Sequence, residues 1–352
     1  MSSMQIDLEA PRGTRMPMPS ARGPLSAHLI AVLSGLEANP GFAAAAQALV
    51  DGNRDHRWIV FDEDAQLSLT ILYELHLQGL SEVSDRWEWD LDLLAGRATL
   101  EAVFEAALRE IGAVPAEDGP EAVVPRLWEM TAPSAGPGMS TFMAREADVE
   151  QFREVLIHRS LNQLREADVH TLGIPRLAGA PKGALVEVQA DEYGGGRLER
   201  MHSTLFATTM RELGLSSQYA HYLDLVPSVT LASLNALSLF GLHRRLLGAL
   251  VGHLCAVETT SSAPSKDYSA GLRRLGFGRA ATLFYDEHVE ADSVHEQIVV
   301  RDLAGGLAQQ RPELAADIIF GAAACLALDD LLGAHITGCW SRGESSLRAP
   351  AV

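Results

Sequence analysis

Two histidines and an aspartate recur at helical spacing in the segment HVEADSVH. His288, Asp292 and His295 occupy positions i, i+4 and i+7, and these positions share one face of an α-helix. Imidazole and carboxylate groups on a common face can converge on a metal ion. The ordinary alternative is a solvated polar stripe. The segment is therefore a candidate metal site that ligands from elsewhere must complete.

A second pair of potential ligands, Glu192 and His202, flanks the three glycines 194–196. On a straight helix their side chains would lie about 80° apart, whereas three looped-out residues would return them to one face after two turns. We therefore expect the glycines to bulge or kink a helix. Glu199 is a rival ligand, because Glu-x-x-His spacing occurs in ferritin-like carboxylate sites. A simple loop with Glu192 at the surface is the other alternative.

The elements that must position these residues are predicted to be helices. Apolar residues recur at helical spacing in several segments: 25–40, 65–83, 145–170, 184–213, 228–257, 268–307 and 312–336. Residues 145–170 are predicted to form one long amphipathic helix. Only short stretches such as HRWIVF, residues 56–61, could be strands. The pattern predicts an all-α fold, in the form of a compact bundle.

A proline-rich stretch from Gly112 to Gly138 predicts an irregular connection that separates the N-terminal third from the rest. We expect a disordered tail over residues 1–22, without the apolar stretch of a signal peptide. A helical extension with the proline-rich connection would follow over residues 23–145. A domain carrying the candidate ligands would then span residues 146–348.

Composition argues against several classes of partner. The chain has 352 residues with 28 Lys+Arg and 46 Asp+Glu, a formal charge of −18, and no dense basic run. We therefore expect neither nucleic acid nor a membrane surface as partner. No apolar stretch reaches the roughly 18 residues of a membrane span. Cys255, Cys325 and Cys339 lack CxxC spacing, which favours reduced thiols in the cytoplasm.

Several motifs together resemble one known family. The segments LREADVH, ALVEVQADEYGGG, MHSTLF, MRELGL and FYDEHVEADSVHEQ are similar to those of the heme-oxygenase-like diiron oxidases, also described as iron-containing redox enzymes. The resemblance covers roughly residues 147–348. It implies a helical bundle of the heme-oxygenase type, here with additional N-terminal helices, that binds two non-heme irons instead of heme. By this resemblance the metal ligands are Glu166, Glu192, His202, Glu258, His288, Asp292 and His295.

The implied ligand set is consistent in charge. Four carboxylates, from Glu166, Glu192, Glu258 and Asp292, would neutralise two Fe(II) ions. Without metal, the same carboxylates inside an apolar bundle would repel one another and lose hydration. Mixed imidazole and carboxylate ligation also suits iron or manganese better than all-sulfur sets do.

The resemblance implies an oxygenase that uses dioxygen as co-substrate. Our first hypothesis is N-oxygenation of an amino-acid-like or small nitrogenous metabolite in specialised metabolism. The second is an oxidase that cleaves C–C or C–H bonds of an amino or fatty acid, as a desaturase or lyase. The third is an iron- or heme-binding helical protein without oxygenase turnover. We expect a small-molecule substrate and an electron donor of unknown identity as partners, and the N-terminal helices could build a homodimer contact.

Overall fold

The computed structural model describes residues 15–37, 41–53, 55–113, 119–133 and 138–349, and the side chains of residues 290–294 lie outside this description. Within these ranges the chain is helical. The described residues form no strand, and their one extended pairing is an isolated bridge between Met16 and Leu80. The predicted all-helical fold is confirmed. No helix among the residues described is both long and apolar enough to cross a membrane.

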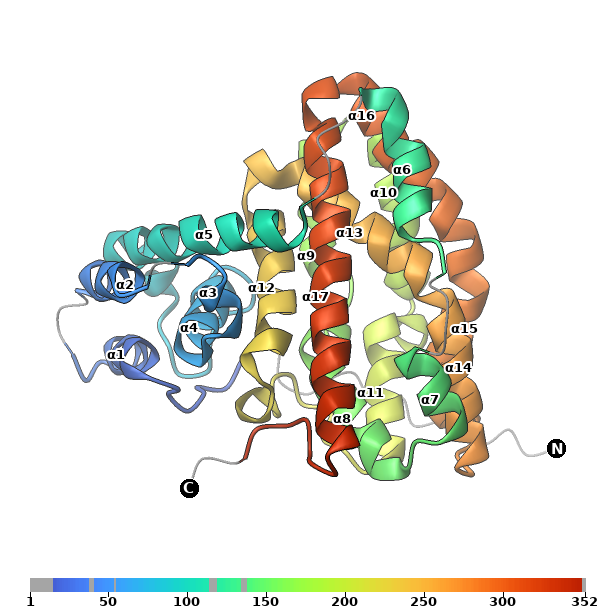
Figure 1. Cartoon of the computed structure of the whole chain (residues 1–352), viewed down its shortest axis with the longest axis horizontal. Coiled ribbons are helices and arrows are strands. Elements are labelled where there is room, and N and C mark those ends of the chain that lie inside the picture. The colour runs from blue at the N-terminus through green and yellow to red at the C-terminus, as the bar shows by residue number, and fades with distance from the viewer. Residues whose placement is uncertain (1–14, 38–40, 54, 114–118, 134–137, 350–352) are drawn as a thin grey trace. The chain divides into compact units, whose positions relative to one another are not determined.

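The α-helices are labelled in Figure 1. They are α1 (Pro24–Leu33), α2 (Phe42–Asp51), α3 (Trp58–Phe61), α4 (Glu63–Glu74), α5 (Leu91–Ile111), α6 (Val123–Met130), α7 (Met139–Arg145), α8 (Val149–Gln163), α9 (Asp168–Thr171), α10 (Gly179–Glu192), α11 (His202–Glu212), α12 (Ser228–Leu242), α13 (Leu247–Thr260), α14 (Ser262–Arg274), α15 (Arg279–Gln297), α16 (Gly306–Gln310) and α17 (Ala315–Ser341). A π-helix spans Ile298–Gly305. Short 3-10 helices span Asp85–Trp89, Pro120–Ala122, Ile174–Arg176, Gly194–Gly196, Leu198–Arg200, Leu223–Leu225, Arg244–Leu246 and Pro312–Leu314.

The chain divides into two compact units. Among the described residues, unit 1 comprises those within 119–219 and 240–323, and unit 2 comprises those within 15–113, 220–239 and 324–349. Helices α12 and α17 contribute residues to both. The domain boundaries expected from the sequence, after residues 22 and 145, stay predictions, and residues 1–14 lie outside the described part of the chain.

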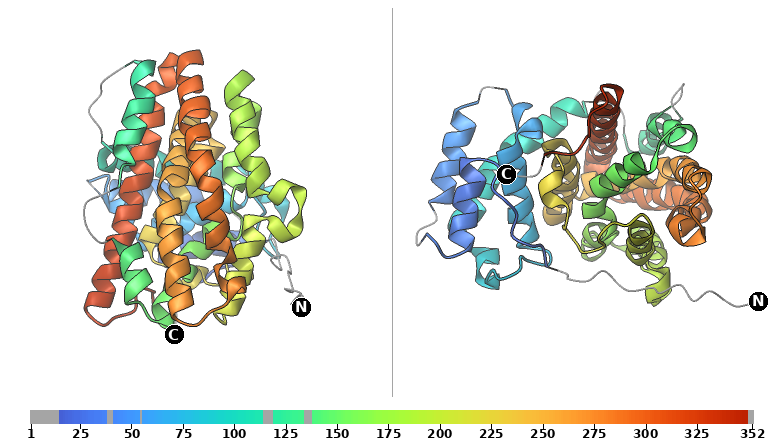
Figure 2. Two further views of the ribbon diagram at one scale, coloured as in Figure 1. Left: turned by 90° about the vertical axis from the view of Figure 1, so that its right-hand side faces the viewer. Right: turned by 90° about the horizontal axis from the view of Figure 1, so that it is seen from below.

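Unit 1 is a bundle built around α15. Helix α14 packs along both α7 and α15, and α11 and α13 also contact α15; Figure 2 shows α14 and α15 running side by side. Two glycines bring α13 close to the start of α17. A side chain at Gly252 would collide with the backbone of Ile318, and one at Gly321 with the backbone of Ala249. This close crossing fixes the position of α13, which carries one of the candidate ligands.

The prediction of one long helix over residues 145–170 is wrong. Helix α8 begins with a capping box, in which the Asp148 side chain accepts from the Gln151 amide and the Gln151 side chain accepts from the Asp148 amide. It ends at Gln163. A turn follows, and Ala167 has a φ of +79°, a left-handed conformation that no α-helix contains. Glu166 therefore lies in a turn between α8 and α9 rather than on a helix face.

The predicted bulge at the three glycines is in fact a complete break between two helices. Helix α10 ends at Glu192, residues 193–201 form a connection, and α11 begins at His202. Gly194, Gly195 and Gly196 all have positive φ, of +63°, +61° and +79°. Such a run is readily available only to glycine. Each candidate ligand thus stands at the end of its own helix.

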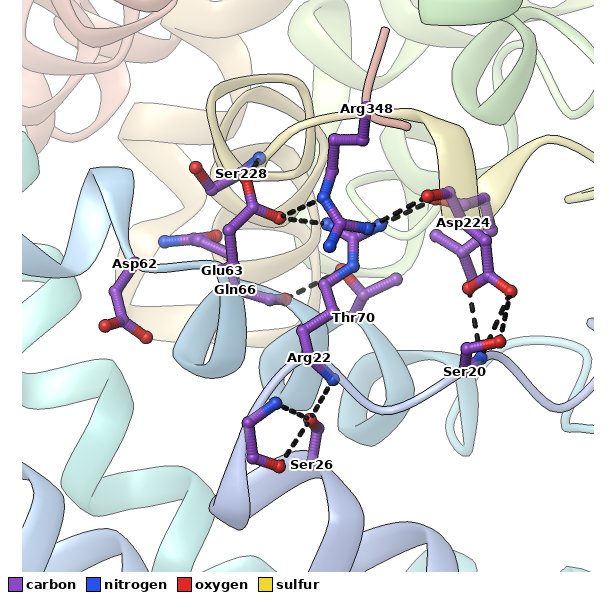
Figure 3. A network of polar contacts seen from close by, with 12 residues as sticks. Ser20, Arg22, Ser26, Asp62, Glu63, Gln66, Thr70, Asp224, Ser228 and Arg348 are labelled. Carbon is purple, nitrogen blue, oxygen red and sulfur yellow. Dashed lines mark hydrogen bonds and ion pairs between the residues drawn. The ribbon is translucent and has the colours of Figure 1, made fainter. Parts of the chain in front are cut away.

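Unit 2 contains the N-terminal helices α1 to α5, with parts of α12 and α17. The prediction that HRWIVF could be a strand is wrong, because Trp58–Phe61 forms α3. A polar network ties segments of this unit that lie far apart in the sequence (Figure 3). Glu63 of α4 accepts from Arg22 at 2.6 Å and is paired with Arg348 at 3.3 Å. Its other oxygen accepts from the amide of Ser228 at 2.7 Å, at the start of α12.

Candidate metal centre

The first group of candidate ligands consists of Glu166, His202 and His288. They come from the turn after α8, from the start of α11 and from the middle of α15. One ligand atom of each lies within 4.8 Å of the others. The Nε2 atom of His288 is 3.6 Å from Oε1 of Glu166, and the rings of His202 and His288 lie 4.4 Å apart between centroids. Three separate segments thus bring two imidazoles and a carboxylate to one point.

The second group consists of Glu192, Glu258 and His295, and all three side chains are buried. They come from the end of α10, from α13 and from α15. Their ligand atoms also lie within 4.8 Å of one another. The Nδ1 atom of His295 is 3.2 Å from Oε2 of Glu258 and 3.9 Å from Oε1 of Glu192. This group supplies two carboxylates and one imidazole.

Glu192 connects the two groups. Its Oε2 atom lies 2.9 Å from Nδ1 of His202, in the first group. Its Oε1 atom faces Nδ1 of His295, in the second group. A carboxylate whose two oxygens face separate ligand groups could contribute to both groups if each held a metal ion. The two groups therefore form one extended centre.

The structure brings six of the seven residues predicted as ligands together. His288 and His295, one in each group, keep the two-turn spacing on α15 that the sequence predicts. Asp292, between them, belongs to residues 290–294 and lies outside the described side chains. Glu199, the rival of Glu192, is exposed in a short 3-10 helix and belongs to neither group. The structure thus places Glu192 rather than Glu199 against His202.

Two contacts to the distal nitrogens of the histidine rings were not predicted from the sequence. The Nδ1 atom of His288 lies 2.7 Å from the carbonyl oxygen of Phe284, one turn earlier on α15. The Nε2 atom of His295 lies 3.1 Å from Oδ2 of Asp191. The first contact follows from helical i, i+4 geometry and could have been foreseen. The second has no spacing signal, because Asp191 directly precedes Glu192 and neighbours on a helix point about 100° apart.

Burial and opposite charges together shift the pKa values of the centre. Burial raises the pKa of Glu192, but the imidazoles of His202, His288 and His295 outweigh it and leave the pKa below its ordinary value. Burial lowers the pKa of His202, but Glu192 more than compensates and raises it. For His295, burial is outweighed by the hydrogen bond and charge of Glu258, and the pKa rises to about 9. The carboxylates thus favour the protonated forms of His202 and His295, and a bound cation would compete with those protons.

One buried oxygen indicates that the donor set fits metal ions. The Oε2 atom of Glu166 is buried and has no hydrogen-bond partner among the described residues. Leaving such a group unsatisfied costs about 1–3 kcal/mol, and a bound cation would remove that cost. Mixed carboxylate and imidazole donors favour iron or manganese over metals that prefer sulfur. The residues present therefore fit a pair of divalent ions of this type.

An all-helical fold that gathers two adjoining carboxylate–histidine groups is consistent with the class of helical diiron proteins. A family model described as an iron-containing redox enzyme matches residues 153–330, just over half of the chain and including all seven predicted ligands. The chain belongs to this family. The resemblance inferred from the sequence is thereby confirmed, as is the heme-oxygenase-like helical fold with N-terminal helices. A search of curated proteins found no match.

Proposed function

We propose that this protein is a non-heme diiron oxygenase that uses dioxygen to N-oxygenate an amino-acid-like or small nitrogenous metabolite in specialised metabolism. The observation that carries the proposal is the position of Glu192 between the two ligand groups, which supports a metal pair rather than two independent ions. Membership of an iron-containing redox enzyme family supports iron as the metal.

The side chains of the centre would hold the irons and keep water away. Glu166, Glu192 and Glu258, with Asp292, supply four negative charges for two Fe(II) ions, so the loaded site is neutral. His202 and His295 are buried, so their part of the site lies in a low-dielectric interior. The bound irons would supply the reducing power that activates dioxygen. The chain contributes the fixed ligand geometry and the exclusion of solvent.

N-oxygenation requires a reductant. One oxygen atom of dioxygen enters the substrate as an N–O bond, and the other leaves as water with two electrons and two protons. An external electron donor must therefore reduce the irons again after each turnover, and we propose such a donor as a partner of this chain.

The first experiment tests reaction type. Protein loaded anaerobically with Fe(II) is exposed to ¹⁸O₂ with a reductant and a panel of amines and amino acids, and products are read by mass spectrometry. A product heavier by one ¹⁸O on nitrogen is expected. A shortened or desaturated product would instead establish the C–C or C–H oxidase. An intense Soret band after hemin titration, with no oxygen incorporation, would establish a heme-binding protein.

The second experiment tests the ligands. His202→Ala and Asp292→Ala should each abolish stoichiometric uptake of two irons and leave the helical circular dichroism largely unchanged. Glu199→Gln is the matched control, because Glu199 is an exposed glutamate close in sequence to His202, and it should bind two irons as the wild type does. Two irons bound by both alanine variants would show that these ligand assignments are wrong.

A further inference from the structure

His295 contacts a carboxylate through each of its ring nitrogens. Nδ1 faces Glu258 and Glu192 within the metal centre, at 3.2 and 3.9 Å. Nε2 faces Asp191, at 3.1 Å. The His295 side chain is 2% exposed, whereas that of Asp191 is 65% exposed and belongs to neither ligand group. The imidazole therefore lies between the buried centre and a carboxylate at the surface.

This arrangement gives the two ring nitrogens different tasks. The nitrogen that faces the two glutamates must be unprotonated to bind a metal ion, so the ring proton must reside on the other nitrogen. A carboxylate can only accept, and Asp191 is placed to accept that proton's hydrogen bond. We propose that Asp191 is a positioning residue that holds His295 as the Nε2–H tautomer, with Nδ1 directed at the metal. The inference rests on the metal pair of the proposed function.

His288 supports the inference by contrast. Its Nδ1 donates to the carbonyl oxygen of Phe284 at 2.7 Å, which leaves Nε2 to face Glu166. The two histidines of α15 thus present opposite ring nitrogens to the centre. The tautomer of His288 is fixed by the backbone of its own helix. For His295, the side chain of Asp191 from α10 takes the role that the Phe284 carbonyl oxygen has for His288. Substitution of Asp191 can therefore change the tautomer of His295.

The negative charge of Asp191 also makes His295 a stronger metal ligand. A carboxylate that accepts from the distal nitrogen orients the ring and raises its basicity, and loss of such partners typically lowers metal affinity about 10–100-fold. Because Asp191 directly precedes Glu192, the last turn of α10 supplies both a ligand and the anchor of a second ligand.

The first test is equilibrium binding of Co(II), used as a probe metal under anaerobic conditions. Wild type should bind two ions. Asp191→Ala should bind one of them about 10–100-fold more weakly and leave the other unchanged, because only the group containing His295 is affected. Asp191→Asn keeps an accepting oxygen and should recover part of the loss. Glu187→Ala, one turn earlier on α10 and also exposed, is the matched control and should bind as the wild type does.

The second test reads the tautomer itself in protein with ¹⁵N-labelled histidine and bound Zn(II). Wild type should show one ring with metal on Nδ1 and a proton on Nε2, and Asp191→Ala should lose this pattern. Unchanged Co(II) affinity together with an unchanged tautomer in Asp191→Ala would overturn the inference while leaving the metal pair standing. Wild type that fails to bind two ions would overturn the proposed function and this inference with it.

Discussion

The replacement Glu192→Gln tests the shared carboxylate most directly. Glutamine keeps the shape of the side chain and one carbonyl oxygen but removes the negative charge that faces both His202 and His295. Two unit charges 4 Å apart at an effective dielectric constant of 20 interact by about 4 kcal/mol. Since about 1.4 kcal/mol corresponds to tenfold in affinity, each metal ion should bind at least roughly three orders of magnitude more weakly. Because the side chain is shared, both ions should be affected.

The assay is anaerobic titration with Fe(II), followed by gel filtration and elemental analysis. Glu192→Gln should retain neither ion at concentrations where the wild type retains two. Glu187→Gln makes the same chemical change at an exposed position of the same helix and should retain both. If Glu192→Gln lost one ion and kept the other at wild-type affinity, the reasoning that this carboxylate serves both groups would be refuted.

The remaining predictions concern the connection before His202 and the titration of two histidines, the buried His295 and the half-buried His76. Gly194→Ala should weaken metal binding although it changes no ligand. Gly194 has a positive φ, and a side chain there would collide with the backbone at residues 200 and 201. Metal titration of the variant checks this prediction, and binding as tight as that of the wild type would contradict it. Because the pKa of His295 is raised to about 9, metal uptake at pH 7 should release a proton, measured by calorimetry in buffers of different ionisation enthalpy. The same shift means that the stability His295 gives the metal-free protein is full below pH 6.5 and is lost as the pH rises through about 9. His76 shows the opposite sign: burial, with a smaller effect of Arg97, lowers its pKa to about 4, so stability falls as the pH drops from 6.5 to about 4. His76→Gln should flatten that part of the urea-unfolding profile, and an unchanged slope would rule the explanation out.

Helical periodicity predicts only part of the site, because Glu166 and Glu258 were expected from the family resemblance alone. The i, i+7 spacing of His288 and His295 depends only on the regularity of one helix, and α15 preserves it. The pairing of Glu192 with His202 was also predicted, but through a kinked helix. The actual route is a break, because three successive glycines with positive φ end α10 instead of bulging it. The sequence therefore predicts that Glu192 and His202 lie together, but it does not predict the path of the backbone between them.

The turn at Glu166 carried no such signal. The segment QLREADVH contains neither glycine nor proline, and its residues favour a helix, yet the chain turns at Ala167 with a φ of +79°. Tertiary packing decides the conformation there: the side chain of Arg165 is buried and its guanidinium lies 5.1 Å from the ring centroid of Tyr219. Likewise, HRWIVF has the apolar, β-branched character of a strand, but Ile59 and Val60 are fully buried in a helix. Local propensity does not foresee contacts of this kind.

The polar network of unit 2 has a practical consequence for how the chain can be rearranged. Ser20 and Arg348 lie near opposite ends of the sequence, yet both bind Asp224: the Ser20 amide donates to its carboxylate at 3.0 Å, and Arg348 donates to its carbonyl oxygen at 2.9 Å. A short linker could therefore join these two segments, and new termini could be opened at the exposed Gly276–Gly278 turn between α14 and α15. A circular permutant of this design would keep all the candidate ligands in a single chain. It would change the order in which the helices are synthesised.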